Sequence, residues 1–233
     1  NWYWGYREHD PKGGYDPYSS SKACCDLAVD SYRNSYFGHS GQLVATVRTG
    51  NTLGGGDWAK DRIIPDCIRA CIHHRPIILR NPRAKRPWQF VLEPLSFYLT
   101  LAEKLLSGEQ SFAESWNAGP PLTALISVRE IADLVIKHWG DGSVIVESED
   151  EKMYESGFLN VDVSKAFLKL NWQTALSIED TIKYTVEWYK ELDKNKSADM
   201  RDFSKRQIRE YRRMAAAKKI PWAFAKELRF SIG

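Results

Sequence analysis

Apolar and polar residues recur along this chain with two periods, one of about 3.6 residues and one of about two. Helical spacing, or a strong capping signal, predicts helices at residues 17–36, 64–74, 93–107, 127–139, 164–170 and 177–192. Short apolar runs predict strands at residues 42–49, 76–80, 88–91 and 143–147. Strands that alternate with helices are typical of an α/β architecture.

Local chemistry marks several helix ends. Asp16 and Pro17 suit the N-cap and the first helical position of the first helix, which we expect to end near Gly38. Ser127 and Glu130 have the spacing of a capping box, so a helix is expected to begin there.

The chain has 233 residues, of which 43% are hydrophobic, which is enough for one large domain or two small ones. It has no run of 18 apolar residues and no visible secretory signal, so no membrane span is expected. The formal charge is +3, but residues 194–233 carry +8 and the remainder −5. We interpret the basic end as a solvated terminal helix. A nucleic-acid or anionic surface partner is the less favoured alternative.

Four cysteines occur in two pairs, and neither pair resembles a disulfide framework. Reduced thiols in a cytoplasmic setting fit this usage best. Cys67 and Cys71, with His73 and His74 nearby, also invite a zinc interpretation. However, the two cysteines lie on one amphipathic segment and no second ligand pair follows, so we expect them to pack in the core and expect no metal site.

Tyr18 and Lys22 place a phenol and an ammonium one helical turn apart. A nearby cation favours phenolate over phenol, which can make a tyrosine a general base. Taken alone the spacing is weak, because any helix with Tyr and Lys four residues apart has it. The residues around the pair must therefore show whether it is a catalytic pair.

The strand that follows this helix ends near Thr49 and Asn51. Ligands of open α/β sheets bind beyond the carboxyl ends of the strands, so a cofactor and a substrate could meet Tyr18 there. Asn51 is equally well explained as a turn residue. The run from Gly54 to Asp57 predicts a loop, which we interpret as a flexible connection, although three glycines would also let the backbone approach a phosphate.

Basic residues gather further along the chain, where arginine could bind phosphate bidentately and an indole could stack or pack beside it. The residues of this cluster are Arg80, Arg83, Lys85 and Arg86, with Trp88 after them and Arg62 before them. As an isolated charge run, the cluster would be a solvated loop.

The run DPYSSSKA, from Asp16 to Ala23, resembles the active-site helix of the extended short-chain dehydrogenase/reductase superfamily. The order that follows is similar too, with a strand ending in Arg-x-x-Asn, a helix starting at Ile63-Ile64-Pro65 and then Arg86-x-Trp88. More narrowly, residue 1 to roughly Tyr211 resembles the CDP-glucose 4,6-dehydratase family. The motifs that carry this narrower resemblance are Trp4 to Glu8, Gly13-Gly14, Gly54 to Trp58, Asp61-Arg62, Arg80 to Pro82, Arg86 to Gln89 and Val91 to Leu95.

For the fold, the resemblance implies the C-terminal part of a Rossmann-like, doubly wound parallel sheet plus a smaller mixed α/β substrate-binding region. Residues 1–56 would be the C-terminal part of the NAD-binding domain. Residues 57–193 would be mainly the nucleotide-sugar-binding region, interleaved with the Rossmann part. Residues 194–233 would be a basic C-terminal helix or tail, and residues 215–233 have no counterpart in the family.

For the activity, the resemblance implies an NAD-dependent lyase that converts CDP-glucose to CDP-4-keto-6-deoxyglucose in deoxysugar and polysaccharide biosynthesis. Tyr18 would take the 4-hydroxyl proton, and Lys22 would favour the phenolate and bind the nicotinamide ribose. The cofactor-binding residues would be Tyr18, Lys22 and Thr49, and the substrate-binding residues Asn51, Arg62, Arg80, Arg86 and Trp88. A homodimer or tetramer in the cytoplasm is expected, without nucleic-acid or membrane partners.

Two other interpretations stay open. The chain could belong to a nucleotide-sugar epimerase or reductase of the same superfamily. It could also be a non-catalytic interaction module that uses the Tyr18 helix. In this superfamily that helix commonly packs in a dimer interface, and Ala23, Leu27 and Ala28 are consistent with such packing.

The family's Gly-x-x-Gly-x-x-Gly run, which holds the NAD pyrophosphate on helix N-terminal amides, does not occur in this sequence. We therefore expect the chain to be an N-terminally truncated portion of such an enzyme, inactive alone. Residues 1–233 should show no NAD binding by isothermal titration calorimetry. A micromolar affinity would contradict this prediction.

Overall fold

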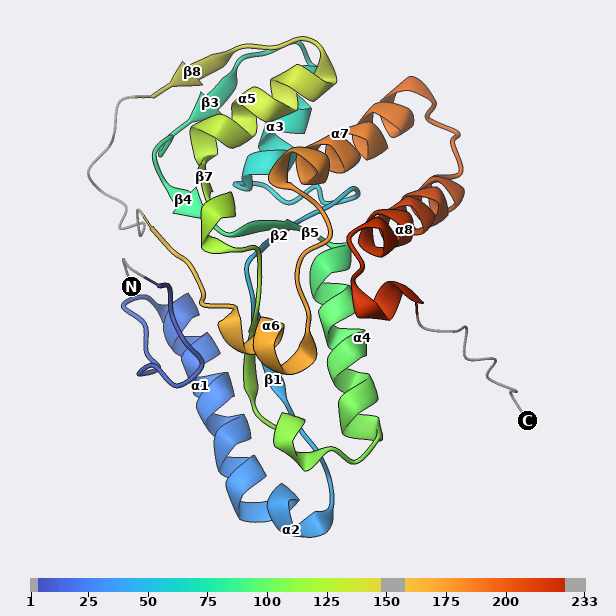
Figure 1. The fold of residues 1–233 in the computed structure, drawn as a ribbon. Coiled ribbons are helices and arrows are strands. Elements are labelled where there is room, and N and C mark those ends of the chain that lie inside the picture. Colours follow the sequence, from blue (N-terminus) through green and yellow to red (C-terminus); the bar gives the residue numbers. More distant parts are fainter. Residues whose placement is uncertain (1–3, 148–157, 225–233) are drawn as a thin grey trace.

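This α/β molecule, a computed structural model, has helices on both sides of short strands, and the structure describes residues 4–147 and 158–224 (Figure 1). The helices are α1 (Pro17–Tyr32), α2 (Gly38–Ser40), α3 (Ile63–Ile72), α4 (Leu92–Leu106), α5 (Val128–Trp139), α6 (Ser164–Leu170), α7 (Ile178–Lys194) and α8 (Met200–Ala217). The strands are β1 (Thr46–Thr49), β2 (Asn51–Leu53), β3 (Ile77–Leu79), β4 (Lys85–Arg86), β5 (Trp88–Phe90), β6 (Ser115–Ala118), β7 (Ile126–Ser127) and β8 (Val144–Val146). Residues 225–233, the end of the expected basic tail, lie outside the described ranges.

The described strands pair two by two. The pairs β1–β6, β2–β5 and β3–β8 are parallel, and β4–β7 is antiparallel. In the first pair the register runs from Thr46 opposite Ser115 to Thr49 opposite Ala118. The predicted α/β class with parallel strands is therefore confirmed.

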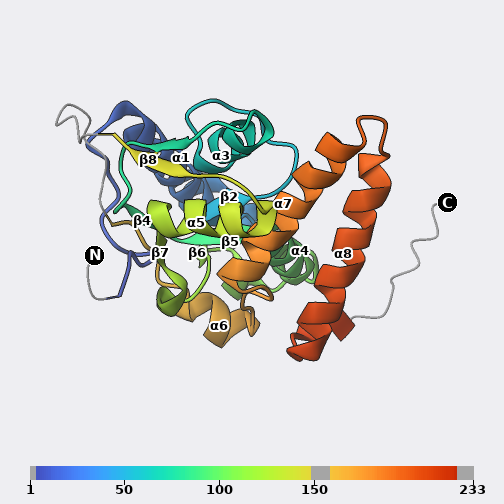
Figure 2. The same ribbon diagram turned by 90° about the horizontal axis from the view of Figure 1, so that it is seen from above.

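Two groups of helices surround these strands. Figure 1 shows β1 running between α1 and α4, and Figure 2 shows the same molecule from above. The second group, α3, α5 and α7, encloses a core with β3 around Ile68, Ile77 and Ile131, which are almost wholly buried. Burial of such side chains stabilises the fold by about 1.5–3 kcal/mol each. None of the described helices combines the length and the apolar character that crossing a bilayer requires.

The two helical cysteines lie where the amphipathic pattern predicted. Cys67 and Cys71 are 0% and 3% exposed and pack in the core formed by α3, α5 and α7. Burial raises the pKa of both thiols, so they stay protonated and behave as small apolar side chains. The prediction that they pack in the core is confirmed.

The first helix continues further than the sequence indicated. After α1, a π-helical turn (Arg33–Phe37) leads directly into α2, and Gly38 is helical with φ −58°. The chain leaves the helix at Gly41, whose φ is +74°. The expected end near Gly38 is therefore wrong, because the left-handed conformation that ends a helix falls on the next glycine.

The strand expected at residues 42–49 is shorter than predicted. Its partner β6 begins only at Ser115, so the ladder starts at Thr46. The residues before β1 are held by a side chain instead, since Arg33 Nε donates to the carbonyl oxygen of Val44 at 2.9 Å. Four strands were missed, namely β2, β4, β6 and β7.

Within the basic end of the chain, residues 200–217 form helix α8, which packs against the rest of the molecule. Helix α8 buries Gln207, Tyr211 and Ala215 on one face. The Tyr211 ring stacks on Trp222, with the ring centroids 5.4 Å apart. The basic residues occupy the outward side, which explains why the charge pattern alone did not show the packing.

Glu93 is a buried carboxylate that joins three distant segments. Its oxygens accept hydrogen bonds from the backbone N–H groups of Ala175, at 3.0 Å, and Leu176, at 2.8 Å. The hydroxyl of Tyr211 on α8 donates to it at 2.8 Å. Glu93 is only 1% exposed, and this burial raises its pKa. The residue thus has a structural role, which the sequence left undefined.

Replacing Glu93 by glutamine should destabilise the chain by about 2–3 kcal/mol, because one acceptor oxygen becomes an amide that faces N–H donors. Urea unfolding followed by circular dichroism measures this change. The control is Glu103→Gln, an exposed site on the same helix, which should stay within about 0.5 kcal/mol of the parent. Equal midpoints for the two variants would contradict the assigned role.

Candidate functional site

The Tyr18–Lys22 pair lies in the first turns of α1. The Asp16 carboxylate accepts a hydrogen bond from the Ser19 amide at 3.0 Å, and hydrogen bonds from Ser19 lower the pKa of Asp16. Tyr18 is 72% exposed, and the Lys22 ammonium lies 5.5 Å from the centroid of its ring. The two heads therefore share one accessible face of the helix, as their spacing predicted.

Polar contacts hold α1 against the strands, because none of its residues is buried. Arg48 of β1 pairs with Asp26 of α1 at 2.5 Å. The Arg48 guanidinium also reaches the carbonyl oxygen of Glu8 at 3.5 Å, and the Glu8 carboxylate accepts from the amide of Asn117 at 2.9 Å. These contacts set the position of Tyr18 relative to the carboxyl ends of β1 and β6.

Thr49 and Asn51 lie where β1 ends and β2 begins, at the carboxyl end of β1. Between them, the Gly50 amide donates to the carbonyl oxygen of Ala118 at 3.1 Å. A Cβ on Gly50 would lie 2.2 Å from the carbonyl oxygen of Pro87, so the close passage of the two strand pairs requires glycine. Asn51 is exposed at this junction and thus available to a ligand.

Two of the predicted arginines meet at one loop. Arg62 pairs with Asp57 at 3.1 Å, and Arg80 pairs with Asp61 at 2.8 Å. Both guanidinium groups remain more than half exposed. The loop of residues 54–62 thus carries Arg62 and supplies the two carboxylates that pair with Arg62 and Arg80.

The other basic residues separate into exposed and buried positions. Arg83 and Lys85 face solvent, whereas Arg86 is 8% exposed and its Nη1 donates to the carbonyl oxygen of Lys85 at 2.9 Å. Trp88 is 6% exposed, packs in the core and lies opposite Asn51 in the β2–β5 ladder. The cluster is therefore not simply a solvated loop.

The structure brings the predicted residues into three groups rather than one. Tyr18 and Lys22 form the first on α1, Asn51 with Trp88 the second, and Arg62 with Arg80 the third. The exposed phenol and ammonium suit the nicotinamide-ribose end of NAD. The exposed guanidinium groups suit a diphosphate.

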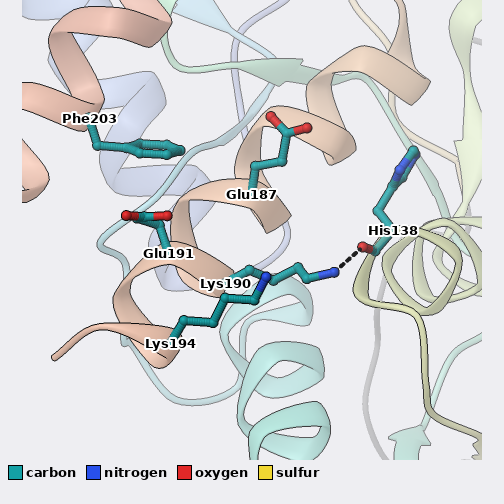
Figure 3. A pocket seen from close by; sticks show the side chains of 6 residues that line it. All are labelled: His138, Glu187, Lys190, Glu191, Lys194 and Phe203. Atoms are coloured by element: carbon teal, nitrogen blue, oxygen red, sulfur yellow. Dashed lines mark hydrogen bonds between the residues drawn. The ribbon is translucent and has the colours of Figure 1, made fainter. Parts of the chain in front are cut away.

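A shallow pocket lies elsewhere, between the end of α5 and the α7–α8 pair (Figure 3). Its lining residues are His138, Glu187, Lys190, Glu191, Lys194 and Phe203. Lys190 donates to the carbonyl oxygens of His138 and Trp139, at 3.1 and 2.9 Å, and thus caps α5. Burial and the nearby Lys137 ammonium lower the pKa of His138. The pocket contains none of the predicted site residues.

Sequence reasoning missed residues that position the site, above all Asn117 of β6. Its side-chain amide donates to the carbonyl oxygens of Tyr6, at 2.8 Å, and Asp162, at 3.1 Å. The side chain is fully buried and joins two distant segments beside the end of β6. No local signal could have identified it, because its partners lie far away in the sequence.

Comparison with known proteins shows which proteins this chain is similar to. No family model matches the chain. The CDP-glucose 4,6-dehydratase of Salmonella typhimurium is 41% identical over 215 residues, which cover 90% of this chain and 59% of that protein. The chain is therefore similar to a CDP-glucose 4,6-dehydratase over most of its own length. It thus spans about three fifths of that relative's length.

Other similar proteins have lower sequence identity. The dTDP-glucose 4,6-dehydratase of Haemophilus influenzae is 25% identical over 197 residues, covering 79% of this chain and 54% of the relative. A solved structure of DesIV, the dTDP-glucose 4,6-dehydratase of Streptomyces venezuelae with NAD and TYD bound, superposes with a TM-score of 0.67. It shares 20% identity and matches 80% of this chain and 55% of its own. These neighbours confirm the predicted Rossmann-type fold.

Proposed function

We propose that this chain forms the nucleotide-sugar-binding part of a CDP-glucose 4,6-dehydratase, an NAD-dependent lyase of deoxysugar biosynthesis. The observation that carries the proposal is the 41% identity to the Salmonella enzyme over 90% of the chain. The accessible Tyr18–Lys22 pair on α1 supplies the matching chemistry.

Tyr18 acts as the base of the first step. Its phenolate takes the proton of the sugar 4-hydroxyl, and the Lys22 ammonium stabilises that phenolate and binds the nicotinamide ribose. NAD, held at Tyr18, Lys22 and Thr49, would supply the hydride acceptor for C4 and the hydride donor for C6. The 4-keto group acidifies the C5 proton, so that loss of this proton with the C6 hydroxyl as water gives a 4-keto-5,6-ene. Addition of the hydride at C6 and of a proton at C5 then gives CDP-4-keto-6-deoxyglucose. Thr49 lies at the strand end where the cofactor and the sugar meet.

The substrate side is built from the other two groups. Arg62 and Arg80 bind the diphosphate through the guanidinium N–H groups that do not contact Asp57 and Asp61. Asn51 donates to a sugar or phosphate oxygen at the junction of β1 and β2. Arg86 and Trp88 form the buried support of this surface.

The proposal extends to the oligomeric state and to the cellular compartment of the protein. Leu27 on α1 is 52% exposed, and α1 buries no residue, which supports a homodimer or tetramer that covers this helix. All four cysteines are free thiols, which supports a reducing compartment such as the cytoplasm.

CDP-glucose should bind residues 1–233 detectably in a calorimetric titration, because the proposed substrate residues lie on this chain. Arg62→Ala should weaken the affinity about tenfold, the effect of losing one charge-assisted contact. Arg83→Ala, an exposed arginine outside the proposed site, is the control and should leave the affinity unchanged. Equal affinities for the two variants would show that Arg62 does not contact CDP-glucose.

In the enzyme assembled with an amino-terminal NAD-binding part, Tyr18→Phe should lower kcat by about 10²–10⁴. CDP-glucose affinity should hardly change, since the hydroxyl serves the proton transfer. Formation of the 4-keto-6-deoxy sugar, followed by its absorbance in alkali, measures the rate. Tyr32→Phe on the same helix is the control. Unchanged turnover would exclude Tyr18 as the base, and a 4-epimer as the product would favour an epimerase.

A further inference from the structure

Two aromatic residues of α7 contact the loop of residues 54–62 and fix its backbone. Tyr189, which is 1% exposed, donates its hydroxyl hydrogen bond to the carbonyl oxygen of Asp57 at 2.6 Å. Its ring meets Trp58 edge on, with the centroids 5.1 Å apart. Burial raises the pKa of Tyr189 to about 12, so the hydroxyl keeps the proton that it donates.

Trp188 holds the glycine run at the start of the same loop. A Cβ on Gly55 would lie 2.1 Å from the indole, so only glycine lets the backbone rest against this side chain. The indole Nε1 donates to the hydroxyl of Ser204 on α8 at 3.1 Å, which fixes the ring. The glycines therefore allow close packing here, and the expected flexible connection is wrong.

A series of contacts leads from the backbone of this loop to Arg62. The Asp57 carboxylate accepts from the amide of Ala59 at 2.9 Å and pairs with the Arg62 guanidinium at 3.1 Å. Arg69 of α3 donates to the carbonyl oxygens of Trp58, at 2.9 Å, and Ala59, at 3.2 Å. The Arg62 side chain is exposed, and its guanidinium pairs with Asp57. The orientation of Arg62 therefore depends on the Asp57 backbone, which Tyr189 holds.

We propose that Trp188 and Tyr189 are positioning residues that orient the Arg62 guanidinium toward the diphosphate of the nucleotide sugar. This inference rests on the proposed function, since it assigns α7 a part in the same site. The effect passes from the Tyr189 hydroxyl to the Asp57 backbone, and from the Asp57 carboxylate to Arg62. A guanidinium held in place loses less conformational freedom when it binds, and its bidentate geometry is preserved.

Tyr189→Phe tests the first contact with the loss of one hydroxyl. The matched control is Tyr184→Phe on the same helix, whose hydroxyl contacts the sulfur of Met214 at 3.4 Å, away from the loop. In limited trypsin digestion, cleavage after Lys60 and Arg62, quantified by mass spectrometry, should be about fivefold faster in Tyr189→Phe than in the control. Calorimetry with CDP-glucose should show about fivefold weaker binding for the same variant.

Gly55→Ala tests the second contact, because its methyl group would collide with Trp188. Gly13→Ala, at a glycine with open space around it, is the control. Gly55→Ala should show the same faster cleavage and weaker binding, and Gly13→Ala neither. Circular dichroism verifies that all four variants are folded.

The outcomes separate the positioning role from the proposed function. Unchanged cleavage in both Tyr189→Phe and Gly55→Ala would overturn the idea that α7 holds the loop. Faster cleavage with unchanged affinity would show that the loop is held but does not orient Arg62 for the ligand, which overturns the proposal. If the parent chain fails to bind CDP-glucose, the proposed function falls together with the positioning role, while the cleavage rates still decide whether the loop is held.

Discussion

The Glu93 carboxylate joins parts of the molecule that come from separate stretches of the chain. It lies in the first turn of α4 and accepts hydrogen bonds from the backbone at Ala175 and Leu176 and from the Tyr211 hydroxyl on α8. Taking a carboxylate out of water is unfavourable unless its oxygens are satisfied, so this burial requires all three segments in place. The carboxylate thereby locates α7, which begins directly after Leu176, and α8 relative to the strands.

The three groups of the candidate site depend on this arrangement to different degrees. The loop of residues 54–62 rests on α7, and α7 is tied to α8 through Trp188 and Ser204. The position of Asn51 instead depends on the close approach of Gly50 to Pro87, which is a contact between two strand pairs. Tyr18 depends on neither, since α1 is fixed by its own ion pairs. The site thus combines one rigidly packed side with one side held by charges.

The sequence predicted best the features whose signals lie within one helical turn. The Asp16 N-cap, the capping box of Ser127 and Glu130 and the shared face of Tyr18 and Lys22 all have the predicted geometry. Strand β6 was missed, because the burial of Ser115–Ala118 depends on its partner β1 and leaves no alternating pattern. The role of the glycine run was misjudged for a similar reason, since its packing partner on α7 is distant in sequence.

The attachment of α1 carries a consequence for the chemistry of Tyr18. The helix contributes no buried side chain, and its contacts with the strands include the Asp26–Arg48 ion pair and the hydrogen bond that the Ser115 hydroxyl donates to Asp30. Partly exposed ion pairs weaken as dissolved ions screen them, whereas the packing of α7 on the loop does not. Ionic strength therefore acts unequally on the two sides of the candidate site, and it changes how firmly Tyr18 is held relative to the loop of residues 54–62 without altering a covalent bond.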